Sequence, residues 1–157
     1  MAGPAHLIGL ISDTHGLVRP EVFGALDGVE LILHAGDVGE GVLDELATIA
    51  PIEAVYGNTD PVDDPRLAQS IERSLGGVRI HVSHGHELGS PTPERLVAKY
   101  DADVIVYGHT HQQKVVEVNG HLVVNPGAAG QRRFKLKPSV AVLTIEHGAA
   151  RVRIVAL

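Results

Sequence analysis

The chain has 157 residues, 44% of them hydrophobic and 20% charged, so we expect one globular α/β domain over residues 1–157. Its formal net charge is -6 and it carries no basic stripe, which argues against binding to a nucleic-acid duplex. It contains no cysteine, which excludes disulfides and thiolate metal sites, so any bound metal must use nitrogen and oxygen ligands.

The N-terminal segment lacks the features of a secretory signal. Residues 1–10 have neither a cationic start nor a small-residue cleavage site, and their apolar run is too short to span a membrane. We therefore expect a cytoplasmic protein without a membrane segment.

The first two thirds of the chain alternate expected strands with expected helices. Runs rich in β-branched residues predict strands at about 6–12, 30–35, 52–56, 78–83 and 103–107. Helical patterns lie at about 20–27, 40–49 and 92–100, the last with Thr92 as its cap and Pro93 at its first position. The segment 59–75 has no clear period, so we expect a loop or short helix there. Such alternation is typical of parallel βαβ units.

From about Val115 the chain reads as strands joined by glycine turns. Strands are expected at about 121–124, 139–146 and 150–156, and hairpin tips at Asn119-Gly120 and His147-Gly148. We therefore expect mixed sheets, with this β-rich part packing a second sheet against the first.

Five expected strands end in residues that can bind a metal ion. The exits read Ser12-Asp13-Thr14-His15-Gly16, Ala35-Gly36-Asp37, Tyr56-Gly57-Asn58, Ser83-His84-Gly85-His86 and Tyr107-Gly108-His109-Thr110-His111. In open α/β sheets, ligands bind beyond the carboxyl ends of the strands. A single histidine of this kind is more often a packed or surface residue. Its recurrence at successive strand ends indicates a shared centre.

These exits supply two carboxylates, one amide and four imidazoles: Asp13, His15, Asp37, Asn58, His84, His109 and His111. One ion takes about four to six ligands, so this set suits two ions, with Asp37 as the bridging carboxylate. Two divalent ions and two carboxylates leave a charge of about +2, which attracts a phosphoryl group. The pattern therefore predicts a dinuclear phosphoesterase.

The order of these motifs, followed by Asn125-Pro126-Gly127, resembles the calcineurin-like metallophosphoesterase superfamily. The likeness covers about residues 6–155 and is strongest to the small YfcE-type phosphodiesterases, whose relatives include the retromer subunit Vps29. It implies a four-layer αββα sandwich in which helices flank two mixed sheets. It also implies two ligand sets that share Asp37: one metal held by Asp13, His15, Asp37 and His111, the other by Asp37, Asn58, His84 and His109.

One departure from the family pattern concerns the general acid. Thr59 stands where larger phosphatases of the superfamily have a histidine that can protonate the leaving group. His86 is our candidate for this role, and the alternative is that it orients water. Asp60 is expected to hold either a ligand histidine or the loop.

The other departure lies in the last motif. Ala128 replaces the serine that commonly follows Asn-Pro-Gly, Arg132 replaces a proline, and Arg133 matches the family arginine. Either arginine is a candidate to bind the substrate phosphate. The alternative is a solvated basic turn.

We therefore predict a metal-dependent phosphodiesterase or phosphatase that hydrolyses a small phosphoester with a metal-activated hydroxide. Asp37, Asn58 and His86 are its predicted catalytic residues. Mn²⁺ is the expected ion, with Fe, Co, Ni and Zn left open because imidazole and carboxylate do not select among them. The alternatives are a mononuclear hydrolase and a non-catalytic, Vps29-like protein-binding scaffold. A homodimer is compatible with the family.

Overall fold

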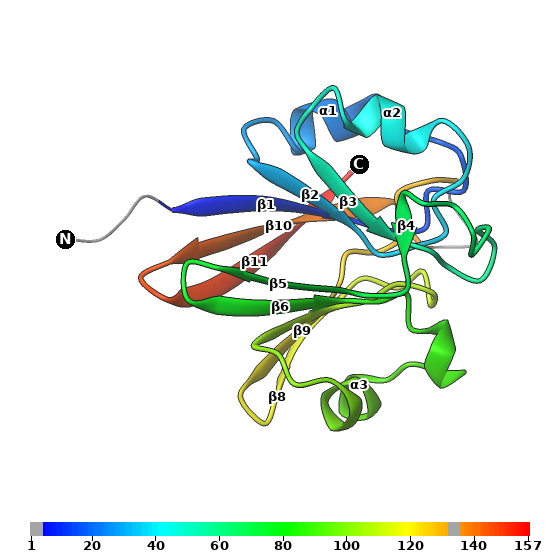
Figure 1. Cartoon of the computed structure of the whole chain (residues 1–157). Coiled ribbons are helices and arrows are strands. Elements are labelled where there is room, and N and C mark those ends of the chain that lie inside the picture. The colour runs from blue at the N-terminus through cyan, green and yellow to red at the C-terminus, as the bar shows by residue number, and fades with distance from the viewer. Residues whose placement is uncertain (1–4, 132–135) are drawn as a thin grey trace.

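Two β-sheets lie face to face with helices on their outer faces (Figure 1) in this computed structural model, which describes residues 5–131 and 136–157. The elements follow one another as β1 (His6–Ile11), α1 (Glu21–Ala25), β2 (Leu31–His34), α2 (Val42–Leu46), β3 (Ile52–Val55), β4 (Leu67–Ala68), β5 (Ile71–Leu75), β6 (Val78–Val82), the 3₁₀ turn η1 (His86–Leu88), α3 (Pro93–Lys99), β7 (Val104–Val106), β8 (Lys114–Val118), β9 (His121–Asn125), β10 (Ser139–Glu146) and β11 (Ala149–Ala156).

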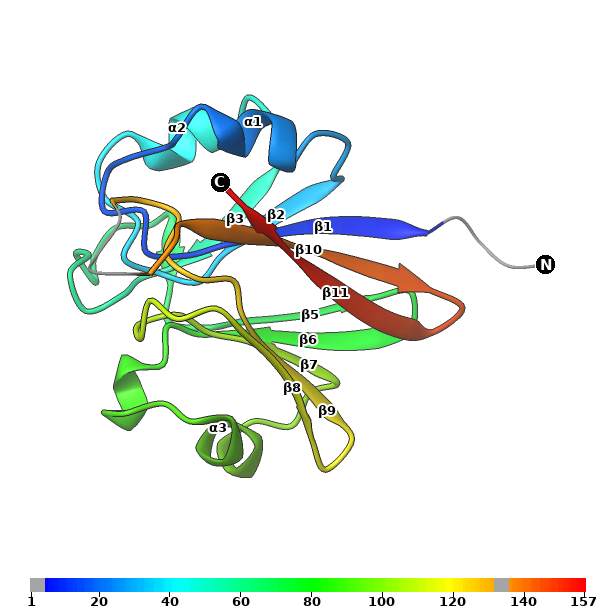
Figure 2. The ribbon, with the colours of Figure 1, turned by 180° about the vertical axis from the view of Figure 1, so that it is seen from behind.

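Both sheets are mixed. The first has the strand order β11-β10-β1-β2-β3-β4, in which β1 to β4 are parallel and β10 runs antiparallel to both of its neighbours, β1 and β11. The second has the order β5-β6-β7-β9-β8, in which β6, β7 and β9 are parallel and the two edge strands antiparallel. Helices α1 and α2 cover the first sheet and α3 covers the second (Figure 2). The predicted αββα sandwich with two mixed sheets is confirmed.

Strand alternation explains the layers, because successive side chains point to opposite faces of a sheet. In β1, Ile8 and Leu10 belong to the core between the sheets, whereas Ile11 packs in the core beneath α1 and α2. In β7, Val104 and Val106 enter the core between the sheets, and Ile105 packs against Leu96 of α3. Strands that are buried on both faces therefore appear in the sequence as continuous apolar runs.

Most elements predicted from the sequence are present with small differences in their bounds. All eight expected strands form, and the three helices are shorter than expected. The predicted cap of α3 is confirmed, because the Thr92 hydroxyl accepts a hydrogen bond from the Arg95 N–H at 3.2 Å. Asn119 and His147 both have left-handed backbones and are followed by glycine, as two-residue hairpin turns require. None of the helices described is long and apolar enough to cross a membrane.

The prediction of a loop or short helix over residues 59–75 is wrong in its second half. β4 pairs with β3, and β5 pairs antiparallel with β6 across the turn Gly76-Gly77, whose φ angles are 55° and 82°. That Gly-Gly turn is a hairpin signal that sequence reasoning missed. β4 has only two residues, and its extended conformation depends on the neighbouring edge of β3 rather than on any local period.

Candidate metal centre

The predicted donors lie where the parallel strands of both sheets end. β1, β2 and β3 end before Asp13, Asp37 and Asn58, and β6 and β7 end before His84 and His109. The two sheets meet here, since His84 of the second sheet donates a hydrogen bond through Nδ1 to the Ala35 carbonyl of the first at 2.8 Å. Residues separated by up to about a hundred positions in the chain are thereby brought into one cluster.

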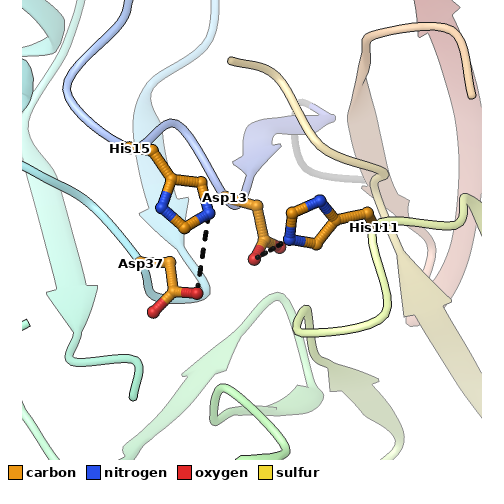
Figure 3. A group of neighbouring side chains, drawn as sticks. All are labelled: Asp13, His15, Asp37 and His111. Carbon is orange, nitrogen blue, oxygen red and sulfur yellow. Dashed lines mark ion pairs between the residues drawn. The ribbon is translucent and has the colours of Figure 1, made fainter. Parts of the chain in front are cut away.

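Four of the donors form a first group: Asp13, His15, Asp37 and His111 (Figure 3). Each offers a nitrogen or oxygen atom, and these atoms all lie within 4.8 Å of one another. The His111 Nε2 lies 3.3 Å from the Asp13 Oδ1, and the His15 Nε2 lies 3.7 Å from the Asp37 Oδ2. Both carboxylates are buried, at 0% and 3% exposure.

A second group lies beside the first and includes Asn58, His84 and His109. The Asn58 Oδ1 lies 3.1 Å from the His84 Nε2 and 3.2 Å from the His109 Nδ1. The His84 Nε2 also lies 3.3 Å from the Asp37 Oδ2. The structure therefore brings together all seven donors that the sequence singles out.

Asp37 lies between the two groups. Its Oδ2 faces His15 of the first group and His84 of the second, whereas its Oδ1 accepts hydrogen bonds from the Thr59 N–H at 3.0 Å and hydroxyl at 2.8 Å. Burial opposes ionisation of Asp37, but the His84 imidazole and the Thr59 hydrogen bonds outweigh it and hold the pKa well below its usual range. An ionised oxygen that two groups share has the position of a bridging ligand.

The donor set fits divalent metal. The Asp13 Oδ1 is buried and has no hydrogen-bond partner, although buried carboxylate oxygens normally have one. A carbonyl oxygen can only accept, so His84 must carry its proton on Nδ1, and the lone pair of its Nε2 faces the cluster. Nitrogen and oxygen donors of this kind suit Mn, Fe, Co, Ni and Zn.

A proton and a metal ion would compete for the imidazole of His84. Burial opposes protonation of His84, but the Asp37 and Asp13 carboxylates outweigh it and raise the pKa of this imidazole. The pKa of His109 is lowered, mainly by burial. A metal ion at this position would have to displace a proton from the His84 Nε2, so its binding would tighten as the pH rises.

Five of the seven donors have a left-handed backbone, with φ of 54° at Asp13, 47° at His15, 56° at Asp37, 73° at His109 and 64° at His111. Such conformations are uncommon for residues other than glycine and cluster at functional sites. They turn the side chains back over the strand ends and into the cluster. The local sequence does not reveal them.

Close backbone approach explains two glycines that precede donors. A Cβ atom on Gly57 would lie 2.1 Å from the Asp37 Oδ1, and a Cβ atom on Gly108 would lie 2.1 Å from the Ser12 Oγ. Any side chain at either position would displace a carboxylate or its partner. Glycine is therefore required here by space rather than by turn geometry alone.

Several supporting residues escaped sequence reasoning. The Ser12 hydroxyl donates to the Asp13 Oδ2 at 2.6 Å, and the His109 N–H donates to the same oxygen at 3.2 Å. The Asn125 side chain donates to the Gly108 carbonyl at 3.2 Å and to the Thr110 hydroxyl at 3.0 Å. Only Asn125 has a sequence signal, the Asn-Pro-Gly motif.

Asp60 holds a loop rather than a ligand histidine. Its carboxylate accepts hydrogen bonds from the backbone N–H groups of Val38, Gly39 and Gly57 at 2.9–3.2 Å. These contacts connect the turn after β2 to the turn after β3. The sequence left two roles open for Asp60, and the structure supports the role of holding a loop.

His86 lies at the edge of the second group. Its ring centroid is 5.3 Å from that of His84 and 6.4 Å from that of His109, and its side chain is 28% exposed. Its Nδ1 is buried without a hydrogen-bond partner. The predicted phosphate-binding residues, Arg132 and Arg133, lie outside the described residues.

Comparison with known proteins gives a consistent picture. The family model of the calcineurin-like phosphoesterase superfamily domain matches residues 7–148. A probable metallophosphoesterase of Methanothermobacter thermautotrophicus is 40% identical over 149 residues, which cover 89% of this chain and 86% of the relative. A phosphodiesterase of Methanocaldococcus jannaschii is 30% identical over 139 residues, which cover 76% and 82%. Vacuolar protein sorting 29 from Cryptosporidium parvum shares the fold, with a TM-score of 0.80 at 23% identity over 98% of both chains.

Proposed function

The chain belongs to the calcineurin-like phosphoesterase superfamily, and on that premise we propose that it is a dinuclear metal-dependent hydrolase of small phosphoesters, with phosphodiesters as the preferred substrates. The observation that carries the proposal is the position of Asp37, whose Oδ2 faces donors of both groups. The preference for diesters rests on the relative from Methanocaldococcus jannaschii that is named a phosphodiesterase.

The ligands divide between two ions that share Asp37. Asp13, His15 and His111 would hold one ion together with it, and Asn58, His84 and His109 the other. The nature of these ions is left open by the donors, and Mn²⁺ is the first to test. When bound, such a pair polarises phosphoryl oxygens and lowers the pKa of water, which supplies the nucleophile.

The chain's own residues contribute charge balance and orientation. Only two of the seven donors are carboxylates, so a loaded centre keeps positive charge for an anionic phosphoester. Thr59 donates two hydrogen bonds to the Asp37 Oδ1, which leaves the Oδ2 free to face both groups. His86, on the edge of the second group, is the proposed proton donor to the leaving group.

A protein-binding scaffold is the competing function, and the likeness to vacuolar protein sorting 29 concerns the fold alone. A scaffold has no need of seven converging donors. Nor does it need left-handed backbones at five of them, which lower stability by about 1–3 kcal/mol each. The complete and strained donor set therefore favours hydrolysis.

The test is hydrolysis of a panel of nitrophenyl phosphodiesters and monoesters by chelator-treated protein with and without added Mn²⁺. We expect turnover only when metal is restored, and faster turnover of the diesters. Folded protein that stays inactive with every ester and every candidate metal would favour the scaffold.

Two histidines offer a matched pair of variants. His111 and His147 both have left-handed backbones, with φ of 64° and 56°, but His147 lies on the hairpin between β10 and β11. Glycine tolerates this conformation at both positions. His111→Gly should lower the rate by at least about a hundredfold, or about 2.7 kcal/mol, whereas His147→Gly should retain wild-type activity. Equal losses in the two variants would contradict a ligand role for His111.

A further inference from the structure

His34, the last residue of β2, is fully buried beneath the metal centre and belongs to neither donor group. Its Nδ1 accepts a hydrogen bond from the Gly36 N–H at 3.0 Å. The proton of the neutral ring therefore sits on Nε2, which donates to the Thr14 hydroxyl at 2.9 Å. Thr14 in turn donates to the Val38 carbonyl at 2.6 Å. Both ring nitrogens are thus hydrogen-bonded, each to a different turn.

The two turns that His34 joins carry three of the proposed ligands. One turn contains Asp13 and His15 on either side of Thr14, and the other contains Asp37 between Gly36 and Val38. Backbone hydrogen bonds also run between them, from the His15 N–H to the Asp37 carbonyl at 3.0 Å and from the Asp13 N–H to the Gly36 carbonyl at 3.0 Å. All three ligands have left-handed backbones, so the turns need support from outside.

Filling space does not account for this imidazole. Desolvation of a buried polar ring is unfavourable unless its nitrogens are hydrogen-bonded, and an apolar side chain would fill the core without that cost. Burial also lowers the pKa of His34 to about 4, so the ring is neutral at neutral pH and its single proton keeps one arrangement of donor and acceptor. A residue that joins two turns through both of its ring nitrogens requires such a fixed arrangement.

We propose that His34 is a positioning residue that holds the turn of Asp13 and His15 against the turn of Asp37, and thereby sets the affinity of the centre for metal. The inference rests on the proposed dinuclear centre. His34 is not among the seven proposed ligands, so it acts through the two turns to which it is hydrogen-bonded.

The two hydrogen bonds that His34 makes to the turns can be removed separately. His34→Asn retains an acceptor near the position of Nδ1 but cannot reach Thr14, and His34→Gln retains a donor near the position of Nε2 but loses the acceptor for Gly36. Thr14→Val removes the hydroxyl at constant shape, and Thr14→Ser restores it. Ile145→Val is the control, because Ile145 pairs with His6 at the end of β1 remote from the centre.

The measurement is the affinity for Mn²⁺ and the number of ions bound, from competition with a chelator, alongside urea unfolding without metal. We expect His34→Asn, His34→Gln and Thr14→Val to bind Mn²⁺ about ten- to a hundredfold more weakly. Thr14→Ser should bind nearly as tightly as wild type. Ile145→Val should unfold more easily and bind as wild type does.

The outcomes separate this inference from the proposed function. If the wild-type protein binds Mn²⁺ tightly and the first three variants bind it within about twofold of wild type, His34 supports only folding and the inference is wrong. If the wild-type protein binds no metal, the proposed function fails and this inference fails with it. Weakened binding in Ile145→Val equal to that in the His34 variants would also overturn it, because loss of stability alone would then explain the effect.

Discussion

The buried imidazole of His34 should make the metal-free protein less stable in mild acid. Burial lowers the pKa of His34 from its ordinary 6.5 to about 4, against the opposing effect of the Asp13 and Asp60 carboxylates. The unfolded chain binds a proton at this residue near pH 6.5, whereas the folded chain does not until near pH 4. Below pH 6.5 the unfolded state is therefore favoured progressively, and stability falls as the pH falls.

The size of the effect follows from the two pKa values. Between about pH 7.5 and about pH 5 the proton bound by unfolded His34 contributes about 2 kcal/mol in favour of unfolding, at about 1.4 kcal/mol per pH unit below the unfolded pKa. That is a substantial part of the stability of a domain of this size, which is typically about 5–15 kcal/mol.

Urea unfolding of the chelated protein at the two pH values, compared with His34→Gln, measures this contribution. Glutamine does not titrate, and the other shifted histidines are common to both proteins. His84, whose raised pKa acts in the opposite direction, therefore cancels in the comparison. Wild type should lose about 2 kcal/mol more than the variant on acidification. A difference below about 0.5 kcal/mol, near the uncertainty of such extrapolations, would refute the reasoning from burial.

Three further predictions concern the centre. Elemental analysis after loading with Mn²⁺ should give about two ions per chain, and a value of one or zero would contradict a dinuclear site. Asp37→Ala should abolish activity even in excess metal, because the Asp37 Oδ2 faces both donor groups, whereas excess metal should partly restore the activity of Asn58→Ala. If Asp37→Ala kept more than about a tenth of the wild-type rate, a loss under about 1.4 kcal/mol, Asp37 would not be the bridging ligand. Nitrophenyl diesters should react much faster than alkyl diesters, and His86→Ala should slow the poor leaving groups more, since an alkoxide needs a proton to depart. Equal dependence on leaving-group pKa in both proteins would exclude His86 as the acid.

The strands that carry the centre could be predicted because they are short apolar runs with polar exits. The buried parts of β1, β2 and β7 appear as short apolar runs, and a donor follows each strand within three residues. β6 instead alternates, with Val78, Ile80 and Val82 buried and Arg79 exposed. β4 could not be predicted in this way, because its two residues are extended only by pairing with β3. Conformation that depends on a distant partner leaves little trace in local sequence.

The sequence by itself identified the candidate donors and the chemistry that they suit: no thiolate, two carboxylates, one amide and four imidazoles at strand exits. Only the tertiary structure decided that Asp37 presents one oxygen to both groups and the other to Thr59. It also decided that His34 and Thr14 join the turn of Asp13 and His15 to the turn of Asp37. The physical reason is the separation along the chain over which each property is set. The identity of a ligand is a local property of the chain, whereas distances between ligands are set by sheet pairing and buried hydrogen bonds between residues far apart in sequence.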